Sequence, residues 1–348
     1  MRVLPPKVDP EPGSLYARKD QFPTKDPLEA WRLNLLVGWQ DAGNPVMFAG
    51  CYPWLPPGFD IWKDITKMVP DREAICNANR ERHLKSGIEL SVQSFLPGGP
   101  MEAVFKGRPV IVCGSGPSLG KKLEWIKKAR ELGAAVLCIN GAIAAVPDAD
   151  AFFALERCSK PVWWKDVDTR RVPIWTSPSA ARQIANDWPA TMRYYFLHHW
   201  DVYDGWHEAP ARLHHLLPTL SCMISSSNCL QLLAWCKPSA IGLVGQDLSG
   251  GLSLDPLTGT VNDKGYYWDG SYPPALQGEP ATLDVGVDGQ AVVSSSRMDI
   301  MAKAMSLSGQ LIAHNADIPV VNLGGTGILD LPVKGSPDDW QWFCQQKG

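Results

Sequence analysis

Residues 110–120 read VIVCGSGPSLG, and this stretch decides the fold class. Its first four residues are apolar and have the composition of a buried strand. Gly114 and Gly116 permit a tight turn, and a helical segment follows that ends at Gly133. A strand, a glycine turn and a helix in this order form the usual place where α/β proteins hold a phosphate. The stretch therefore predicts an α/β fold with an anion site at the turn.

Similar apolar segments recur along the chain and alternate with helical ones. The expected strands are residues 108–114, 134–140, 148–156, 172–177, 192–197 and 240–247. An apolar helix is expected at residues 221–236, just before the last of these strands. Buried strands that alternate with helices predict a doubly wound, mostly parallel, Rossmann-like sheet.

Changes in composition divide the chain into parts. We expect a flexible arm at 1–26, a mostly helical N-terminal domain at 27–104, a Rossmann-like domain at 105–330 and a C-terminal tail at 331–348. Residues 248–290 are rich in Gly, Pro, Tyr and Asp and show little periodicity. So long an irregular segment is usually a lid or binding loop. We therefore expect it to be an insertion over the site.

Composition excludes several classes of protein. The 348 residues carry a formal net charge of −3 and no long basic run, which argues against a large nucleic-acid footprint. The start lacks the apolar core of a signal peptide, and no apolar run could span a bilayer. The nine cysteines are scattered and unpaired in spacing, so reduced thiols and no zinc site are expected. These features predict a cytoplasmic protein without membrane insertion.

The glycine turn does not match the two commonest phosphate-binding motifs. In a dinucleotide fingerprint the third glycine would fall on Leu119, and the second strand would end in an acid instead of Asn140. The Walker A lysine pattern is also absent. Lys121 and Lys122 stand in the first helical turn, where positive charge opposes the helix dipole. A bound anion would explain them.

Several motifs together resemble one family. GSGPSL after a strand, CIN at the end of the next, DAFFALE, GLVGQD and VVNLGGTGI occur in this order. This order resembles the bacterial motility accessory factors and 6-hydroxymethylpterin diphosphokinase-like proteins, which are related to the sialyltransferase-like fold. The resemblance covers about residues 77–330. It implies an α/β enzyme that binds an activated nucleotide donor.

The resemblance and the residue types together predict the donor-binding residues. They lie at the glycine turn, at strand ends, at the start of the apolar helix and in the following loop. They are Gly114, Ser115, Gly116, Pro117, Ser118, Asn140, Glu156, Arg157, Ser225, Ser226, Ser227, Asn228, Gly245, Tyr266 and Tyr267. Arg157 suits a phosphate by its bidentate guanidinium, and Glu156 is the one carboxylate at the end of its strand.

Three residues are candidates for the chemistry. Asp247 ends a buried strand and could deprotonate an acceptor hydroxyl. His199 lies in a histidine- and tryptophan-rich segment and is the alternative base. Ser294 stands near the position where the related sialyltransferases carry a catalytic histidine.

The sequence favours a glycosyltransferase that moves a sugar from a nucleotide-activated donor, CMP-linked donors among them, to a hydroxyl acceptor without an obligatory metal. A Mg²⁺-dependent diphosphokinase is the alternative, with Glu156, Asp247 and Asp255 gathered on one ion. A non-catalytic nucleotide-binding module is a third reading. The acceptor (glycan, protein, modified base or small metabolite) and the oligomeric state are left open.

Overall fold

The computed structural model describes residues 72–86, 99–156, 160–198, 218–219, 224–254, 261–263 and 282–346. The predicted arm at 1–26, most of the predicted N-terminal domain and part of the predicted lid lie outside these ranges. Within the described ranges, no helix has the length and apolarity needed to cross a membrane.

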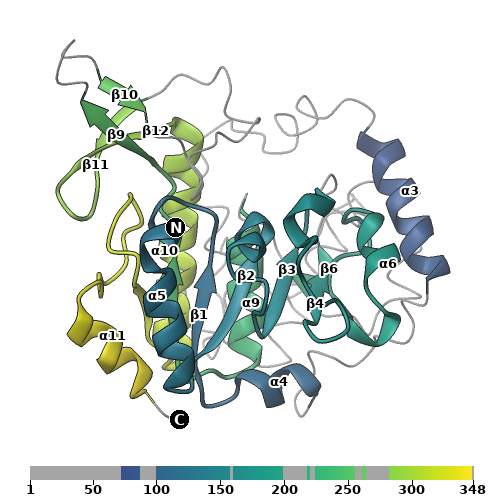
Figure 1. The fold of residues 1–348 in the computed structure, drawn as a ribbon. Helices are drawn as coiled ribbons and strands as arrows, with labels where there is room; N and C mark the ends of the chain where they lie inside the picture. The colour runs from purple at the N-terminus through teal and green to yellow at the C-terminus, as the bar shows by residue number, and fades with distance from the viewer. Residues whose placement is uncertain are drawn as a thin grey trace, which may run out of the picture.

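The centre of the molecule is a seven-stranded sheet in the order β13-β8-β1-β2-β3-β4-β5, and every adjacent pair is parallel (Figure 1). The strands are β1 (Pro109–Cys113), β2 (Ala135–Ile139), β3 (Ala151–Ala154), β4 (Ile174–Thr176), β5 (Arg193–Tyr195), β8 (Ala240–Val244) and β13 (Val320–Asn322). The chain winds from β1 outward to β5, then returns to β8 and β13 on the other side of β1. This doubly wound topology confirms the predicted fold class.

Helices cover both faces of the sheet because its strands are apolar on both sides. Val110 and Val112 of β1 belong to the core beneath one set of helices, and Ile111 and Cys113 to the core beneath the other. The first set is α4 (Pro100–Phe105), α9 (Ser225–Trp235) and α10 (Ser296–Ala316). The second is α5 (Ser118–Glu131), α6 (Gln183–Asp187) and α11 (Pro337–Cys344), with the 3₁₀ segments η4 (Asn140–Ala144), η5 (Pro161–Trp164) and η6 (Ala190–Met192) nearby.

Residues 248–290 are more regular than their composition predicts. The described parts contribute β9 (Gly250–Leu254), β10 (Val261–Asp263) and β11 (Thr282–Val285), which join β12 (Ala291–Ser294) in an antiparallel sheet. This small sheet stands beyond one corner of the main sheet (Figure 1). These strands are ordered by hydrogen bonds between them, which the glycine-rich composition does not reveal. A further parallel pair joins β6 (Leu197–His198) and β7 (Pro218–Thr219).

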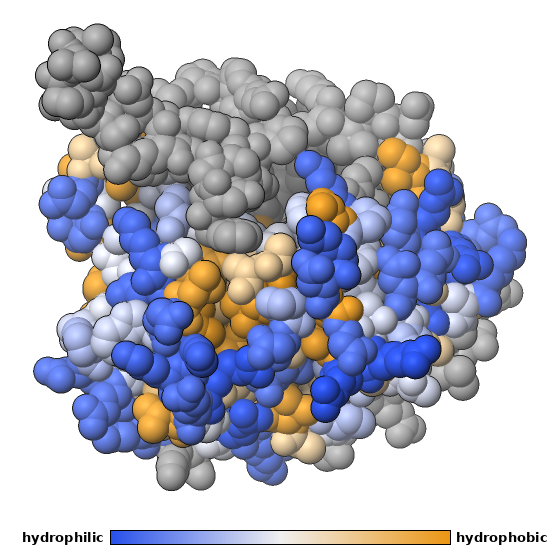
Figure 2. All heavy atoms as spheres, viewed as in Figure 1, coloured by the Kyte–Doolittle hydropathy of each residue, from blue (hydrophilic) through white to orange (hydrophobic). Residues whose placement is uncertain are grey.

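The segment expected to be a C-terminal tail is part of the core. Phe343 and Trp340 of α11 are buried, and α11 lies beside α5 (Figure 1). Gly242 of β8 makes room for them, because an added Cβ would stand 2.2 Å from Leu323 Cδ1 and 3.0 Å from Phe343 Cε2. The C-terminal helix therefore packs on the sheet where Gly242 of β8 leaves space for Phe343. Figure 2 shows that hydrophilic side chains dominate the outer surface of this face.

Helix α3 (Arg72–Lys85) packs against the far end of the sheet. His83 is fully buried, with Nδ1 2.6 Å from the hydroxyl of Tyr195 and Nε2 3.2 Å from the carbonyl oxygen of Ala180. Asn79 donates to the carbonyl of Ser179 and accepts from the Arg182 N–H, so it holds the segment that leads into α6. These polar contacts fix α3 to the loop that follows β4.

Candidate functional site

The candidate site lies at the carboxyl edge of the sheet. The chain leaves β1 toward α5 and β2, whereas β8 enters the sheet on the opposite side of β1. Strand order therefore reverses between β1 and β8. In open α/β sheets, ligands bind beyond the carboxyl ends of the strands at such a reversal.

The turn after β1 is held against the end of β8 by very close backbone contacts. The N–H of Gly114 donates to Val244 O at 2.8 Å, and that of Gly116 donates to Gly245 O at 2.7 Å. An added Cβ on Gly116 would stand 2.3 Å from Asp247 Oδ2. Gly245 itself has a φ of +68°, which a side chain would strain. The glycines therefore serve the packing of two strand ends.

This geometry shows which N–H groups of the turn are already used. The sequence predicts an anion site at the turn, and there Gly114, Gly116 and Ser118 donate their N–H groups to Val244, Gly245 and Asp247. Pro117 has no N–H to offer. Among the described residues of the turn, Ser115 keeps both its N–H and its hydroxyl without a protein partner. Ser115 is therefore the turn residue best placed to meet a ligand.

The Asp247 side chain is buried against the turn and is not open to a ligand. Its Oδ2 accepts from the Ser118 N–H at 3.0 Å and from the Ser118 hydroxyl at 2.9 Å. Its Oδ1 accepts from the Thr326 hydroxyl at 2.5 Å. The side chain is buried, and burial raises its pKa while the bonds from Thr326 and Ser118 act in the opposite direction. The carboxylate thus joins the start of α5 to the loop after β13.

A polar cluster forms where β2, β3 and α9 meet. The Ser225 hydroxyl donates to Glu156 Oε1 at 3.1 Å. The Asn140 amide lies 3.4 Å from Glu156 Oε1 and 3.4 Å from Ser225 Oγ. Asn140 adopts a left-handed φ of +49°, and its buried Oδ1 has no partner among the described residues. Three residues predicted from separate segments are therefore brought together.

Gln246 belongs beside this cluster, although the sequence analysis passes over it. Its Oε1 accepts from the Ser226 hydroxyl at 2.7 Å, while its buried Nε2 has no partner among the described residues. That amide lies against the turn, 2.5 Å from where a Gly114 Cβ would stand. The sequence feature that could have identified Gln246 is its position between Gly245 and Asp247, directly after a buried strand.

The remaining predicted serines and Asn228 point into the protein. The Ser227 hydroxyl donates to Ile224 O at 2.9 Å, and the Ser294 hydroxyl donates to Leu248 O at 3.3 Å. Ser227, Asn228 and Ser294 are buried. Ser225 and Ser226 alone of the predicted α9 residues carry hydroxyls that reach the cluster or Gln246.

Four predicted site residues lie outside the described part of the chain: His199, Arg157, Tyr266 and Tyr267. Their roles stay predictions. Within the described part, no group of three or more His, Cys, Asp or Glu side chains is placed to hold a metal ion.

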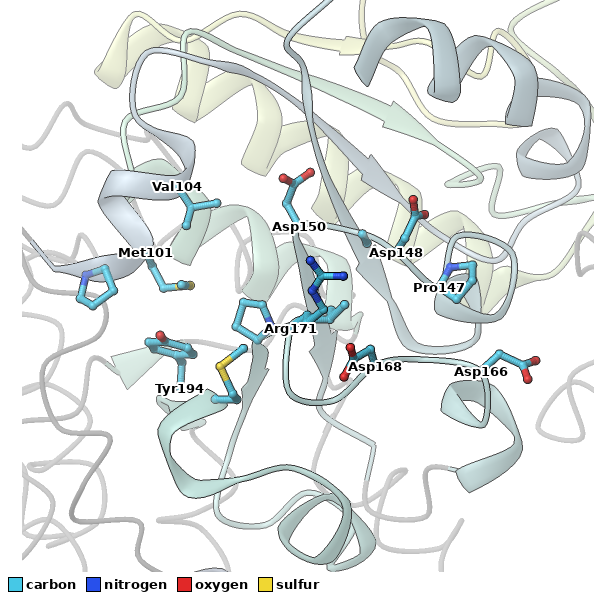
Figure 3. Close-up of a pocket in the computed structure, with 14 residues that line it drawn as sticks. Met101, Val104, Pro147, Asp148, Asp150, Asp166, Asp168, Arg171 and Tyr194 are labelled. Carbon is cyan, nitrogen blue, oxygen red and sulfur yellow. The ribbon is translucent and has the colours of Figure 1, made fainter. Parts of the chain in front are cut away.

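A cavity of about 560 Å³ opens at the opposite, amino-terminal edge of the sheet (Figure 3). Residues that precede β3 and β4 line it, with an apolar wall from Met101 and Val104 of α4. Its carboxylates include Asp148, which accepts from Arg130, and Asp150, which accepts from the Val136 N–H at 2.8 Å. This cavity shares no residue with the carboxyl-edge cluster.

Comparison with known proteins agrees with this architecture. Residues 97–250 match the model of the family described as 6-hydroxymethylpterin diphosphokinase MptE-like. This segment of the chain is therefore similar to that family. The match confirms the resemblance predicted from the sequence, and the matched segment runs from just before α4 to the start of β9.

A search of curated proteins finds no match to this chain. Among solved structures, a similar one is the MAf glycosyltransferase from Magnetospirillum magneticum AMB-1, with 15% sequence identity and a TM-score of 0.47. The alignment covers 70% of this chain and 37% of that one, so this chain spans well under half of that protein's length.

Proposed function

We propose that the protein is a transferase that takes a sugar from a nucleotide-activated donor and passes it to a hydroxyl acceptor at the carboxyl edge of the sheet. The observation that carries the proposal is the meeting of Asn140, Glu156 and Ser225 at hydrogen-bond distance. Hydroxyl, amide and carboxylate groups are those that bind ribose and sugar hydroxyls, and one of them can also take up a proton.

The donor would lie between the turn after β1 and the start of α9. Ile224 precedes α9 and provides no side-chain cap, so the first N–H groups of the helix face this edge with the positive end of its dipole. These groups suit the donor phosphate. Ser115, the Gln246 amide and Asn140 Oδ1 offer further hydrogen bonds to the nucleoside, and donors of pyrimidine type, CMP-linked sugars included, are the first to test.

Glu156 is the group that we assign as base. It is exposed at the carboxyl end of β3, whereas Asp247 and Ser294 are buried and bonded to the protein. In the step, the acceptor oxygen bonds to the anomeric carbon, and the bond from that carbon to the donor phosphate breaks with its electrons. The acceptor proton passes to Glu156, and the nucleotide leaves as an anion that the start of α9 stabilises.

A diphosphokinase is the second candidate, and the description of the matched family favours it. That reaction needs Mg²⁺ on the triphosphate, and Glu156 would be one of its ligands. Asp247 does not suit a second ligand position, since both of its oxygens are bonded to Ser118 and Thr326. Further carboxylates would have to come from parts of the chain outside the described residues, such as Asp255.

The test compares Glu156→Gln with wild type. Glutamine keeps an oxygen that accepts from Ser225 but cannot take up the proton, so donor affinity should stay within about threefold while turnover falls about 10²–10⁴-fold. Calorimetry measures the affinity for CMP and UDP, and chromatography follows nucleotide released from the sugar donor. Glu124→Gln, on the exposed side of α5, is the control and should leave both quantities unchanged.

The same assay separates the two candidates. Nucleotide release from a sugar donor in the presence of a chelator supports the glycosyltransferase. Release of AMP from ATP only with Mg²⁺ would replace it with the diphosphokinase. Full turnover by Glu156→Gln on either substrate would remove Glu156 as the acting group.

A further inference from the structure

We propose that the cavity between the first turn of α5 and the start of α11 is a binding site for a phosphate group, separate from the donor site. The cavity measures about 480 Å³. It is lined by Lys121, Lys122, Gly324, Gly325, Thr326, Val333, Gly335, Ser336 and Asp339. The proposal gives a role to the two lysines that the proposed transfer reaction does not use.

Positive charge in this cavity exceeds negative charge. Lys121 is exposed and makes no ion pair with any described residue, and the Lys122 amine donates to Gly335 O at 2.9 Å, a neutral partner. The only acid of the lining, Asp339, is already engaged. It accepts from the Ser336 hydroxyl at 2.7 Å and lies 3.3 Å from Lys334 Nζ. Two cations therefore stay unbalanced in a protein whose net charge is −3.

The two lysines lie next to each other at a helix start that offers them no acidic partner. The first turn of α5 contains no acidic residue, and the Asp247 carboxylate at the start of the helix is bonded to Ser118 and Thr326 and not to the lysines. Burial lowers the pKa of Lys122, and the neighbouring charge of Lys121 lowers it further. A bound phosphate would relieve the repulsion and form charge-assisted hydrogen bonds with both amines.

The opposite wall allows a ligand to come close to the backbone. Gly325 has a left-handed φ of +73° and no side chain, whereas Gly324 lacks one because an added Cβ would stand 2.7 Å from Ser118 Oγ. Thr326 ends this wall, with its hydroxyl on Asp247. The cavity has room for a phosphate together with a small organic group, so a phosphate ester fits as well as free phosphate.

This inference does not depend on the proposed function. The cavity shares no residue with the cluster of Ser115, Asn140, Glu156 and Ser225, and a phosphate could bind there whatever reaction the cluster supports. Its failure would likewise leave the donor site untouched.

The experiment measures binding of inorganic phosphate, pyrophosphate and glycerol 3-phosphate to the full chain by calorimetry at constant ionic strength. The test variant is Lys121→Gln with Lys122→Gln. The control is Lys127→Gln with Lys128→Gln, which removes the same charge from exposed positions on the same helix. We expect saturable binding that weakens at least about tenfold in the test variant and less than about twofold in the control. Circular dichroism confirms that each variant is folded.

Each outcome is decisive. Tighter binding of the ester than of inorganic phosphate supports a phosphorylated substrate, and the reverse order supports free phosphate or pyrophosphate as the occupant. No saturable binding by wild type overturns the proposal. Equal losses in the two double variants overturn it too, because they would reveal attraction by general surface charge and not a site.

Discussion

At the scale of single residues, the Asp247 carboxylate is occupied by bonds within the protein. Its oxygens accept from Ser118 and Thr326, and its own backbone carbonyl accepts from the Ile328 N–H at 3.0 Å. A carboxylate that is this well bonded is a poor proton acceptor for an incoming hydroxyl. We therefore infer that Asp247 is a positioning residue that holds the turn after β1 to β8 and β13.

Asp247→Asn tests this role. The amide would present N–H groups toward either Ser118 or Thr326, and a buried donor would lose its acceptor. We expect the free energy of unfolding to fall by about 1–3 kcal/mol, together with weaker donor binding. Urea denaturation measures the first quantity and calorimetry the second. If stability and donor affinity stayed at the wild-type level while turnover disappeared, the original hypothesis of a catalytic base would return.

Ser115 is the contrasting residue of the same turn. Its hydroxyl makes no protein hydrogen bond in the described part of the chain, so its removal should leave stability unchanged within about 0.5 kcal/mol. Ser115→Ala should nevertheless weaken donor binding, by a factor of about 3–10 for one neutral hydrogen bond. Thermal unfolding and calorimetry check the two expectations together. A loss of stability without a loss of affinity would assign Ser115 to the turn alone.

At the scale of elements, α3 is fixed to the end of the sheet by a buried histidine that stays neutral. Since Nε2 of His83 faces the Ala180 carbonyl, it carries the proton, and Nδ1 accepts from the Tyr195 hydroxyl. Burial lowers the pKa of His83 from 6.5 to about 4 and raises that of Tyr195 to about 12. Arg193 and Arg82 also lower the pKa of His83 by their charge.

This pKa predicts a pH dependence of stability. The unfolded chain takes up a proton on His83 below pH 6.5, whereas the folded chain resists it until about pH 4. The contribution of neutral His83 to the free energy of unfolding is therefore fully present above pH 6.5. About 3 kcal/mol of it is lost as the pH falls toward 4. Urea unfolding of wild type and His83→Gln at pH 7 and pH 4.5 measures the difference. Parallel pH profiles for the two proteins would show that His83 does not titrate in this way.

At the scale of the whole molecule, the C-terminal helix completes the core. Phe343 is fully buried beside Gly242 and Leu323, so Phe343→Ala leaves a cavity between α11 and β8. We expect a loss of about 3–5 kcal/mol in the free energy of unfolding. Gln341→Ala is the matched control, because Gln341 is exposed on the same helix.

The control should lower the free energy of unfolding by no more than about 0.5 kcal/mol. Equal and small losses in the two variants would mean that α11 is an appendage, in agreement with the tail that composition suggests. A large loss in Phe343→Ala alone would place residues 331–348 within the folding unit.

The sequence by itself determined the parallel sheet, and it named Asn140, Glu156 and Ser225, which the fold brings together. Strand and helix periodicity are local properties, and the carboxyl ends of parallel strands must lie at one edge, so Asn140 and Glu156 could be placed near each other in advance. The family motifs supplied Ser225 in the same way. Gln246 escaped notice because its unpartnered amide exists only in the folded arrangement.

Only the tertiary structure decided which partners the polar groups bond to. The sequence of the turn after β1 is typical of an open phosphate loop. In the structure, however, the N–H groups of Gly116 and Ser118 donate to Gly245 and Asp247, and Ser118 and Asp247 are 129 residues apart along the chain. The order in residues 248–290 and in the C-terminal helix likewise depends on long-range pairing. A pattern along the chain fixes what each segment can form, but the direction of a side chain depends on which neighbours the fold brings to it.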